Sequence, residues 1–191
     1  MVQVRHNPAG EACFNVLLTE DREHAIEHWT QQLPRLLEPF GVRTRLARSG
    51  LDALAEADRT RFHAAVIDLL TPAEPHTPAT RTSEPGTGNA GGKASGGGGG
   101  ARPGGLWLLE VLQRRPNRPP IVVVDNGAYE WRRAQRYLNE ALRLGAFTVI
   151  SQPVDLESLL QAIRRLLDRR YAGHWPGTRN RNSSLQQERL P

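Results

Sequence analysis

The chain has 191 residues, of which 38% are hydrophobic, and a formal net charge of +5 at pH 7. This length suits one domain with appendages, and no apolar run approaches the roughly 20 residues of a membrane span. Cys13 is the single cysteine, which excludes an intrachain disulfide. The first residues carry no apolar signal-peptide core, so we expect a cytoplasmic protein with no membrane partner.

The first third of the chain predicts strands that alternate with helices. Its patterns predict a strand over 14–19, a helix over 22–38 with a kink or late start at Pro34, a strand over 42–47, a helix from the N-cap Ser49 to about Asp58, and a strand over 64–68. Two of these strands are continuous apolar runs, FNVLLT and AAVI. Such runs are typical of parallel strands that are buried on both faces.

Carboxylates follow both apolar runs directly. Side by side, the strand ends would gather Glu20, Asp21 and Asp68. Three ionised carboxylates repel one another, so the cluster would either hold a proton or recruit a hard cation such as Mg²⁺. Alternatively, Glu20 and Asp21 only begin the next helix, where acidic residues favour the helix dipole.

The composition changes abruptly between residues 71 and 103, which are rich in glycine, proline and threonine. This composition predicts a flexible, disordered insert without a core. Beyond it we expect a helix over 106–115, a strand over 121–124, a helix over 130–144 closed by Gly145, a strand over 146–150 and a last helix capped by Asp155. Residues 1–12 are expected to be a flexible N-terminus and 171–191 a polar basic tail.

Five predicted strands alternate with five predicted helices. This order is typical of an α/β domain with a doubly wound parallel sheet covered by helices on both faces. Ligands of such sheets bind beyond the carboxyl ends of the strands. The acidic residues lie at those ends.

Several motifs occur in a familiar order: the acidic pair in LLTED, the aspartate in AVIDLLTP, the helix GLWLLEVL, the strand PPIVVV, and ALRLGAFTVISQPVDLESLLQAIRRLL. With them the chain resembles the receiver domain of bacterial response regulators over residues 13–170, outside the insert. The resemblance implies a flavodoxin-like (βα)5 sheet of order 2-1-3-4-5, with the insert in the loop after the third strand. It also implies a signalling module rather than an enzyme.

The resemblance assigns roles to particular residues. Asp68 corresponds to the phospho-acceptor, and Glu20 and Asp21 would hold Mg²⁺ together with it. Two positions depart from the family pattern, because Gln152 stands where a lysine precedes Pro153 and Asp125 replaces a threonine or serine. Both changes remove groups that would attract or bond a phosphoryl oxygen, so phosphorylation is expected to be slow or lost.

An arginine-rich and aromatic patch opens the fourth predicted helix, with Trp131, Arg132, Arg133, Arg136 and Tyr137. Because Trp, Tyr and Arg are enriched in binding hot spots, the patch could dock a partner. The alternative is a longer solvated helix with Trp131 and Leu138 packed inward.

We expect a stand-alone, atypical receiver in a two-component or phosphorelay pathway. Its partners would be a histidine kinase or phosphotransfer protein and a downstream protein. The alternative is a phosphorylation-independent pseudoreceiver that acts as a protein-binding adaptor. A nucleic-acid binder is a weaker third hypothesis, because the 24 arginines that accompany the single Lys93 are scattered along the chain.

Overall fold

The computed structural model describes residues 14–20, 29–74, 102–125, 129–151 and 154–171. Within these ranges one parallel sheet has the order β2-β1-β3-β4-β5. Its strands are β1 (Phe14–Thr19), β2 (Val42–Ala47), β3 (Ala64–Asp68), β4 (Ile121–Val124) and β5 (Thr148–Ile150). The predicted doubly wound, flavodoxin-like topology is confirmed.

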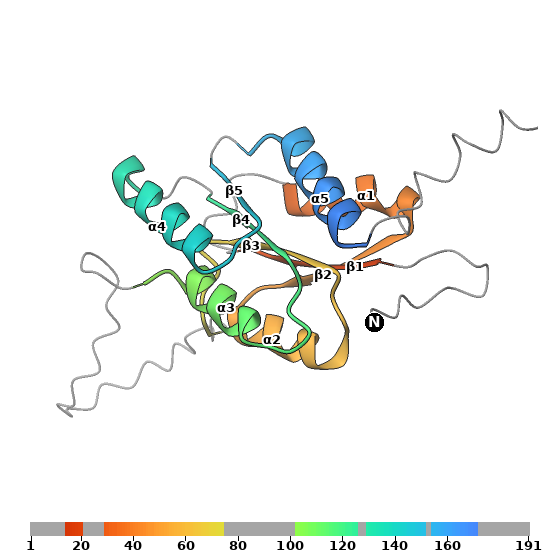
Figure 1. The fold of residues 1–191 in the computed structure, drawn as a ribbon, viewed down its shortest axis with the longest axis horizontal. Coiled ribbons are helices and arrows are strands. Elements are labelled where there is room, and N and C mark those ends of the chain that lie inside the picture. The colour runs from red at the N-terminus through yellow and green to blue at the C-terminus, as the bar shows by residue number, and fades with distance from the viewer. Residues whose placement is uncertain (1–13, 21–28, 75–101, 126–128, 152–153, 172–191) are drawn as a thin grey trace, which may run out of the picture.

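Helices cover both faces of this sheet, with α1 and α5 on one face and α2, α3 and α4 on the other (Figure 1). They are α1 (Trp29–Leu37), α2 (Gly50–Arg59), α3 (Gly104–Gln113), α4 (Trp131–Arg143) and α5 (Leu156–Arg170), with a 3₁₀ turn η1 (Glu38–Phe40) after α1. Every residue of β3 and β4 is buried, as their continuous apolar sequences predict. None of the helices in the described ranges combines the length and the apolar character of a membrane span.

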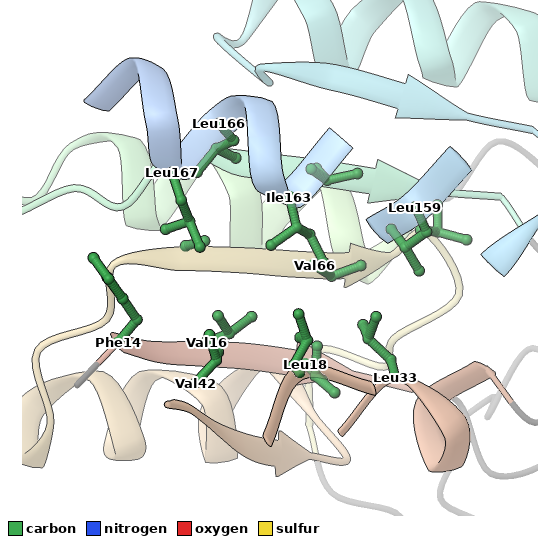
Figure 2. Close-up of a cluster of buried hydrophobic side chains, with 14 of the residues drawn as sticks. Phe14, Val16, Leu18, Leu33, Val42, Val66, Leu159, Ile163, Leu166 and Leu167 are labelled. Atoms are coloured by element: carbon green, nitrogen blue, oxygen red, sulfur yellow. The ribbon is translucent and has the colours of Figure 1, made fainter. Parts of the chain in front are cut away.

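The core on the α1 and α5 face joins strand residues to the apolar stripe of α5 (Figure 2). Val16, Leu18 and Val66 project from the sheet toward Leu159 and Ile163. These side chains are fully buried. Because burying each such side chain contributes about 1.5–3 kcal/mol, the cluster fixes the position of α5 on the sheet.

Two predicted helix caps are confirmed. The Asp52 N–H donates to Ser49 Oγ at 3.1 Å, which begins α2. Asp155 accepts hydrogen bonds from the backbone of Glu157 and Ser158 at the start of α5. Bonds from the Ser158 side chain and from this backbone lower the pKa of Asp155.

Some predicted boundaries need correction. The helix expected over 106–115 is Gly104–Gln113 in the structure, and a Cβ at either of its first two glycines would clash with backbone atoms of the loop after β3. The strand expected from residue 146 begins at Thr148. Pro34 lies inside α1, and the start of the helix expected from residue 22 is outside the described residues.

The ends of the predicted insert belong to the folded body. Thr71 and Pro103 are buried. The Gly50 N–H donates to Pro72 O at 2.7 Å, and the Leu51 N–H donates to Ala73 O at 3.0 Å. The rest of the predicted insert, residues 75–101, lies outside the described residues, as does the expected flexible N-terminus, residues 1–12. Of the tail expected over 171–191, Tyr171 is buried against the folded body, and residues 172–191 lie outside the described residues.

A histidine is buried at the amino-terminal end of the sheet, between the rings of Phe14 and Tyr171, whose centroids lie 5.2 and 5.3 Å from that of His63. His63 Nδ1 accepts a hydrogen bond from the Asn15 N–H at 3.0 Å. Its Nε2 is buried without a hydrogen-bond partner in the described part of the chain. Burial, reinforced by the charge of Arg61, lowers the pKa of His63 from 6.5 to about 4.

This histidine predicts acid-sensitive stability. Between pH 6.5 and 4 the unfolded chain binds a proton at His63 that the folded chain does not, so the free energy of unfolding falls as the pH is lowered. The loss attributable to His63 is about 3 kcal/mol and is complete below pH 4. Urea unfolding of wild type and His63→Gln across this interval measures it. Equal pH dependence in the two proteins would contradict the prediction.

Candidate functional site

The carboxyl ends of three neighbouring strands bring acidic residues to one edge of the sheet. Asp68 is the last residue of β3 and pairs in register with Val124 of β4, which Asp125 follows. Leu18 of β1 pairs with Val66 of β3, so the same register places Glu20 level with Asp68. The structure therefore brings Glu20, Asp68 and Asp125 to a common edge, whereas Asp21 lies outside the described residues.

Asp68 is held on several sides and is fully buried. Its backbone N–H donates to Thr19 Oγ1 at 3.1 Å, and the Leu70 N–H donates to its Oδ1 at 2.9 Å. The hydroxyls of Thr19 and Thr71 are themselves hydrogen-bonded to each other at 2.6 Å. These bonds fix the backbone of β3 at the point where the carboxylate leaves the sheet, and the Leu70 amide orients the carboxylate.

The start of α3 packs directly against this loop. The Gly105 N–H donates to Leu69 O at 3.2 Å. A Cβ at Gly105 would lie 2.3 Å from Asp68 O and 2.8 Å from Leu69 Cα, which are backbone atoms that cannot rotate away. A side chain at this position would therefore displace the segment that carries Asp68.

Gly105→Ala is accordingly expected to destabilise the protein by about 1–3 kcal/mol, the usual cost of overpacking. This clash outweighs the roughly 1 kcal/mol by which alanine favours a helix over glycine. Chemical unfolding measures the difference, with Gln161→Ala at an exposed position of α5 as the control. A stabilised Gly105→Ala protein would show that the packing described here is wrong.

Glu20 turns toward α1. Its Oε2 accepts a hydrogen bond from the Thr30 hydroxyl at 2.5 Å. Thr30 is buried, and Glu20 is half-buried. One carboxylate oxygen of Glu20 is thus oriented by α1. The alternative hypothesis, that Glu20 and Asp21 only begin a helix, concerns residues 21–28, which are outside the described ranges.

The donors at this edge are carboxylate oxygens, the ligands that Mg²⁺ prefers. Among the described residues, however, no group of three or more His, Cys, Asp or Glu side chains is placed to hold a metal ion. Asp125 therefore does not complete a three-carboxylate site with Glu20 and Asp68. The predicted metal site of Glu20, Asp21 and Asp68 needs Asp21 as its third ligand, and Asp21 lies outside the described residues. The three carboxylates of this set are ligands that Mg²⁺ prefers.

Asp125 is buried, with 4% of its surface exposed, and its backbone N–H donates to Ile150 O at 3.0 Å. The sequence did not predict a role for Tyr129, which lies four residues further on. Burial raises the pKa of the Tyr129 phenol, Tyr137 raises it further, and the charges of Asp125 and Asp68 add to the effect. The phenol of Tyr129 therefore lies within electrostatic range of both carboxylates.

A small aromatic and cationic cluster connects Tyr129 to α4. The Tyr129 and Tyr137 ring centroids are 5.1 Å apart. The Arg133 guanidinium lies 5.7 Å from the Tyr129 ring and 5.8 Å from the Tyr137 ring, and Arg133 Nε donates to the Tyr137 hydroxyl at 3.0 Å. A tyrosine shortly after β4 and an arginine one turn later are the only sequence signal for this cluster.

The predicted patch on α4 divides into an exposed and a packed part. Trp131 is 70% exposed, with the Arg132 guanidinium 5.9 Å from its ring, and Arg136 is also exposed. Tyr137 is half-buried and Leu138 is buried. The alternative in which Trp131 and Leu138 both pack inward is therefore wrong for Trp131 and right for Leu138.

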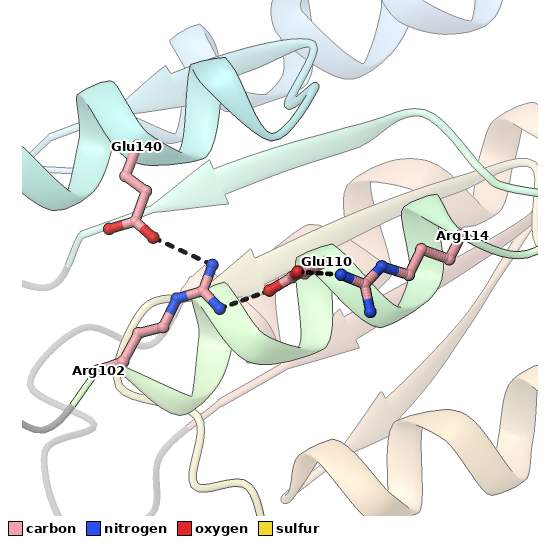
Figure 3. Close-up of polar contacts among 4 residues, drawn as sticks. All are labelled: Arg102, Glu110, Arg114 and Glu140. Carbon is pink, nitrogen blue, oxygen red and sulfur yellow. Dashed lines mark hydrogen bonds and ion pairs between the residues drawn. The ribbon is translucent and has the colours of Figure 1, made fainter.

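An ion-pair network joins α3, α4 and Arg102, which precedes α3 (Figure 3). Arg102 Nη1 lies 2.5 Å from Glu110 Oε2 on α3, and Arg102 Nη2 lies 3.0 Å from Glu140 Oε1 on α4. Arg114 forms a second ion pair with Glu110. Hydrogen bonding from Arg102 lowers the pKa of Glu110, so the network stays ionised at neutral pH.

Gln152 and Pro153, the other positions with assigned roles, lie outside the described residues.

Solved structures place this architecture in a known class. A CheY-like response regulator receiver domain protein from Methanospirillum hungatei is 19% identical, with a TM-score of 0.55 and coverage of 83% of this chain and 97% of that chain. The chemotaxis response regulator CheY4 of Vibrio cholerae is 18% identical, with a TM-score of 0.55 and coverage of 82% and 100%. A response regulator from Burkholderia pseudomallei, solved with a phosphorylated aspartic acid, a calcium ion and citrate, is 21% identical, with a TM-score of 0.51 and coverage of 78% and 65%.

The chain therefore has the fold of response-regulator receiver domains, as its motifs suggested. Neither a protein-family model nor a curated protein sequence matches it. At these identities the comparisons establish the fold alone.

Proposed function

We propose that this chain is an atypical receiver that accepts a phosphoryl group on Asp68 in two-component or phosphorelay signalling. The position of Asp68 carries the proposal. Its carboxylate leaves the sheet at the carboxyl edge, is oriented by the Leu70 amide, and shares that edge with the carboxylates of Glu20 and Asp125. The phosphorylated aspartic acid of the Burkholderia pseudomallei regulator, on the same fold, supports this choice.

In the proposed reaction an oxygen of the Asp68 carboxylate attacks the phosphorus of a phosphohistidine. The new O–P bond forms as the P–N bond breaks, and the imidazole of the donor protein leaves and takes up a proton. Glu20, Asp21 and Asp68 would hold Mg²⁺, which when bound neutralises charge on the phosphoryl oxygens. Since Asp68 is fully buried, its carboxylate has to become accessible before it can react with the donor.

Charge decides how fast this reaction runs. The phosphoryl group is anionic, and the buried Asp125 adds a further carboxylate close to its path. Gln152, unlike the lysine of the resembled family, supplies no compensating cation. We therefore propose slow phosphorylation that depends strongly on the divalent ion.

The proposed partners are a histidine kinase or phosphotransfer protein and a downstream protein. The exposed part of the α4 patch, Trp131, Arg132 and Arg136, is the proposed contact for the latter, and Tyr137 supports it from within. The Tyr129, Arg133 and Tyr137 cluster lies between this patch and the acidic edge. This cluster offers a physical connection through which added charge on Asp68 can affect the patch.

Removal of the metal tests the proposal. Incubation with a small phosphodonor and Mg²⁺ is expected to add the mass of one phosphoryl group to the intact protein. With a chelator in place of Mg²⁺ the rate should fall by about a hundred-fold or more, because several kcal/mol of charge stabilisation is lost. Intact-mass spectrometry over time measures both rates. A wild-type protein that gains no mass would favour the phosphorylation-independent adaptor.

A further inference from the structure

A basic pocket lies at the opposite end of the sheet from Asp68. It has a volume of about 350 Å³ and is lined by Arg118, Pro119, Pro120, Arg143, Leu144, Gly145, Phe147, Arg170 and Gln113. Pro120 immediately precedes β4, and Phe147 immediately precedes β5. The pocket is therefore at the amino-terminal edge, built from the loop before β4 and the ends of α4 and α5.

Three arginines line this pocket, and no carboxylate lines it with them. Arg118, Arg143 and Arg170 are exposed, and none of them forms a hydrogen bond or ion pair with another residue in the described ranges. By contrast, Arg102 and Arg115 each pair with a carboxylate. Uncompensated like charges around one cavity repel one another, and an anion in the cavity relieves that repulsion.

Helix geometry explains part of this arrangement but not all of it. Arg143 and Arg170 close the last turns of α4 and α5, where cations are favourable without any ligand. Arg118 lies in the loop between α3 and β4 and has no such reason to be basic. Arg118 adds a third arginine, from a third element, to the two arginines at the helix ends.

The remaining lining is largely apolar. Pro119, Pro120, Leu144 and Phe147 supply flat hydrocarbon and aromatic surface beside the arginines. Gln113 donates from Nε2 to Gly145 O at 3.0 Å, which ties α3 to the turn before β5 and shapes this side of the pocket. A ligand that matches the pocket therefore has an anionic group joined to an apolar or ring-shaped part.

We propose that this pocket binds a phosphate ester of mononucleotide size through Arg118, Arg143 and Arg170. The planar guanidinium fork matches phosphate oxygens in a bidentate manner. A volume of about 350 Å³ is at the small end of the range for ligand pockets, which suits a single nucleotide. The organic part of the ester packs on the apolar lining.

Isothermal titration calorimetry at near-physiological salt tests this site, with AMP, inorganic phosphate and adenosine as probes. AMP is expected to bind more tightly than either of the other two. Arg118→Gln is expected to weaken AMP binding at least ten-fold, because one charge-assisted hydrogen-bonded contact is lost. Arg165→Gln, an exposed arginine of α5 outside the pocket, is the matched control and should leave binding unchanged.

Any other outcome would contradict the proposal. If AMP does not bind, the proposed site is wrong, and if AMP and inorganic phosphate bind equally, the proposed contact between the organic part and the apolar lining is wrong. Equal losses of AMP affinity in Arg118→Gln and Arg165→Gln would show that AMP binds only through nonspecific attraction to the net positive charge. Thermal unfolding of both variants verifies that they are folded. Asp68→Asn should bind AMP normally, so this inference and the phosphoryl-transfer proposal fail separately.

Discussion

Asp68→Asn is expected to abolish the phosphoryl adduct completely. An amide cannot form the acyl phosphate, yet asparagine retains the size of the side chain and an oxygen that can accept the Leu70 N–H. The fold should therefore persist while the chemistry disappears. Intact-mass spectrometry after incubation with a small phosphodonor and Mg²⁺ measures the adduct, and chemical unfolding verifies the fold.

Asp168→Asn provides the matched control for this experiment. Asp168 is exposed on α5, away from the acidic edge, so the same change of charge and size there should leave the adduct at the wild-type level. An adduct that persists in Asp68→Asn would place the acceptor elsewhere in the chain. That result would remove the central role of the β3 carboxylate.

Asp125→Asn is expected to accelerate phosphorylation by about ten-fold or more. Asp125 is buried and follows β4, beside the strand end that carries Asp68, and a negative charge there would repel the incoming phosphoryl oxygens. Like charges a few ångströms apart near a protein surface interact by a few kcal/mol, and 1.4 kcal/mol already changes a rate ten-fold. The amide of asparagine also provides a hydrogen-bond donor that the carboxylate lacks.

The rate of adduct formation at saturating Mg²⁺ measures this effect. Glu130→Gln is the control, because Glu130 is an exposed carboxylate that precedes α4 and lies farther along the same loop. Its rate should equal that of wild type. If Asp125→Asn were slower than wild type, Asp125 would assist the reaction, and the explanation of slow phosphorylation by excess acidity would be wrong.

Much of the fold could be predicted because buried parallel strands have a strong signature in sequence. The run IVVV is apolar at every position and FNVLLT at four of six, and the strands they predict, 121–124 and 14–19, have the same bounds in the structure. Ser49 and Asp155 were predictable as caps because N-cap chemistry is local. The start of α3 was missed because its two glycines have low helix propensity and are required by a contact with a distant loop.

The candidate site was predictable only where backbone topology determines position. Strand ends bring Glu20, Asp68 and Asp125 to one edge whatever their rotamers. The Thr19 and Thr71 hydrogen bond joins residues 52 positions apart and could not be foreseen from spacing. Tyr129 and the three arginines of the basic pocket depend in the same way on side-chain placement between separate elements.

The most direct test of the central claim is a crystal structure of the protein with Mg²⁺ and beryllofluoride. We predict beryllofluoride bonded to an oxygen of the Asp68 carboxylate, with the metal ion held by Asp68 and by the carboxylates of Glu20 and Asp21. An Asp68 carboxylate without the adduct, or a metal ion bound at other residues, would contradict the account of this edge as a phosphoryl-accepting site.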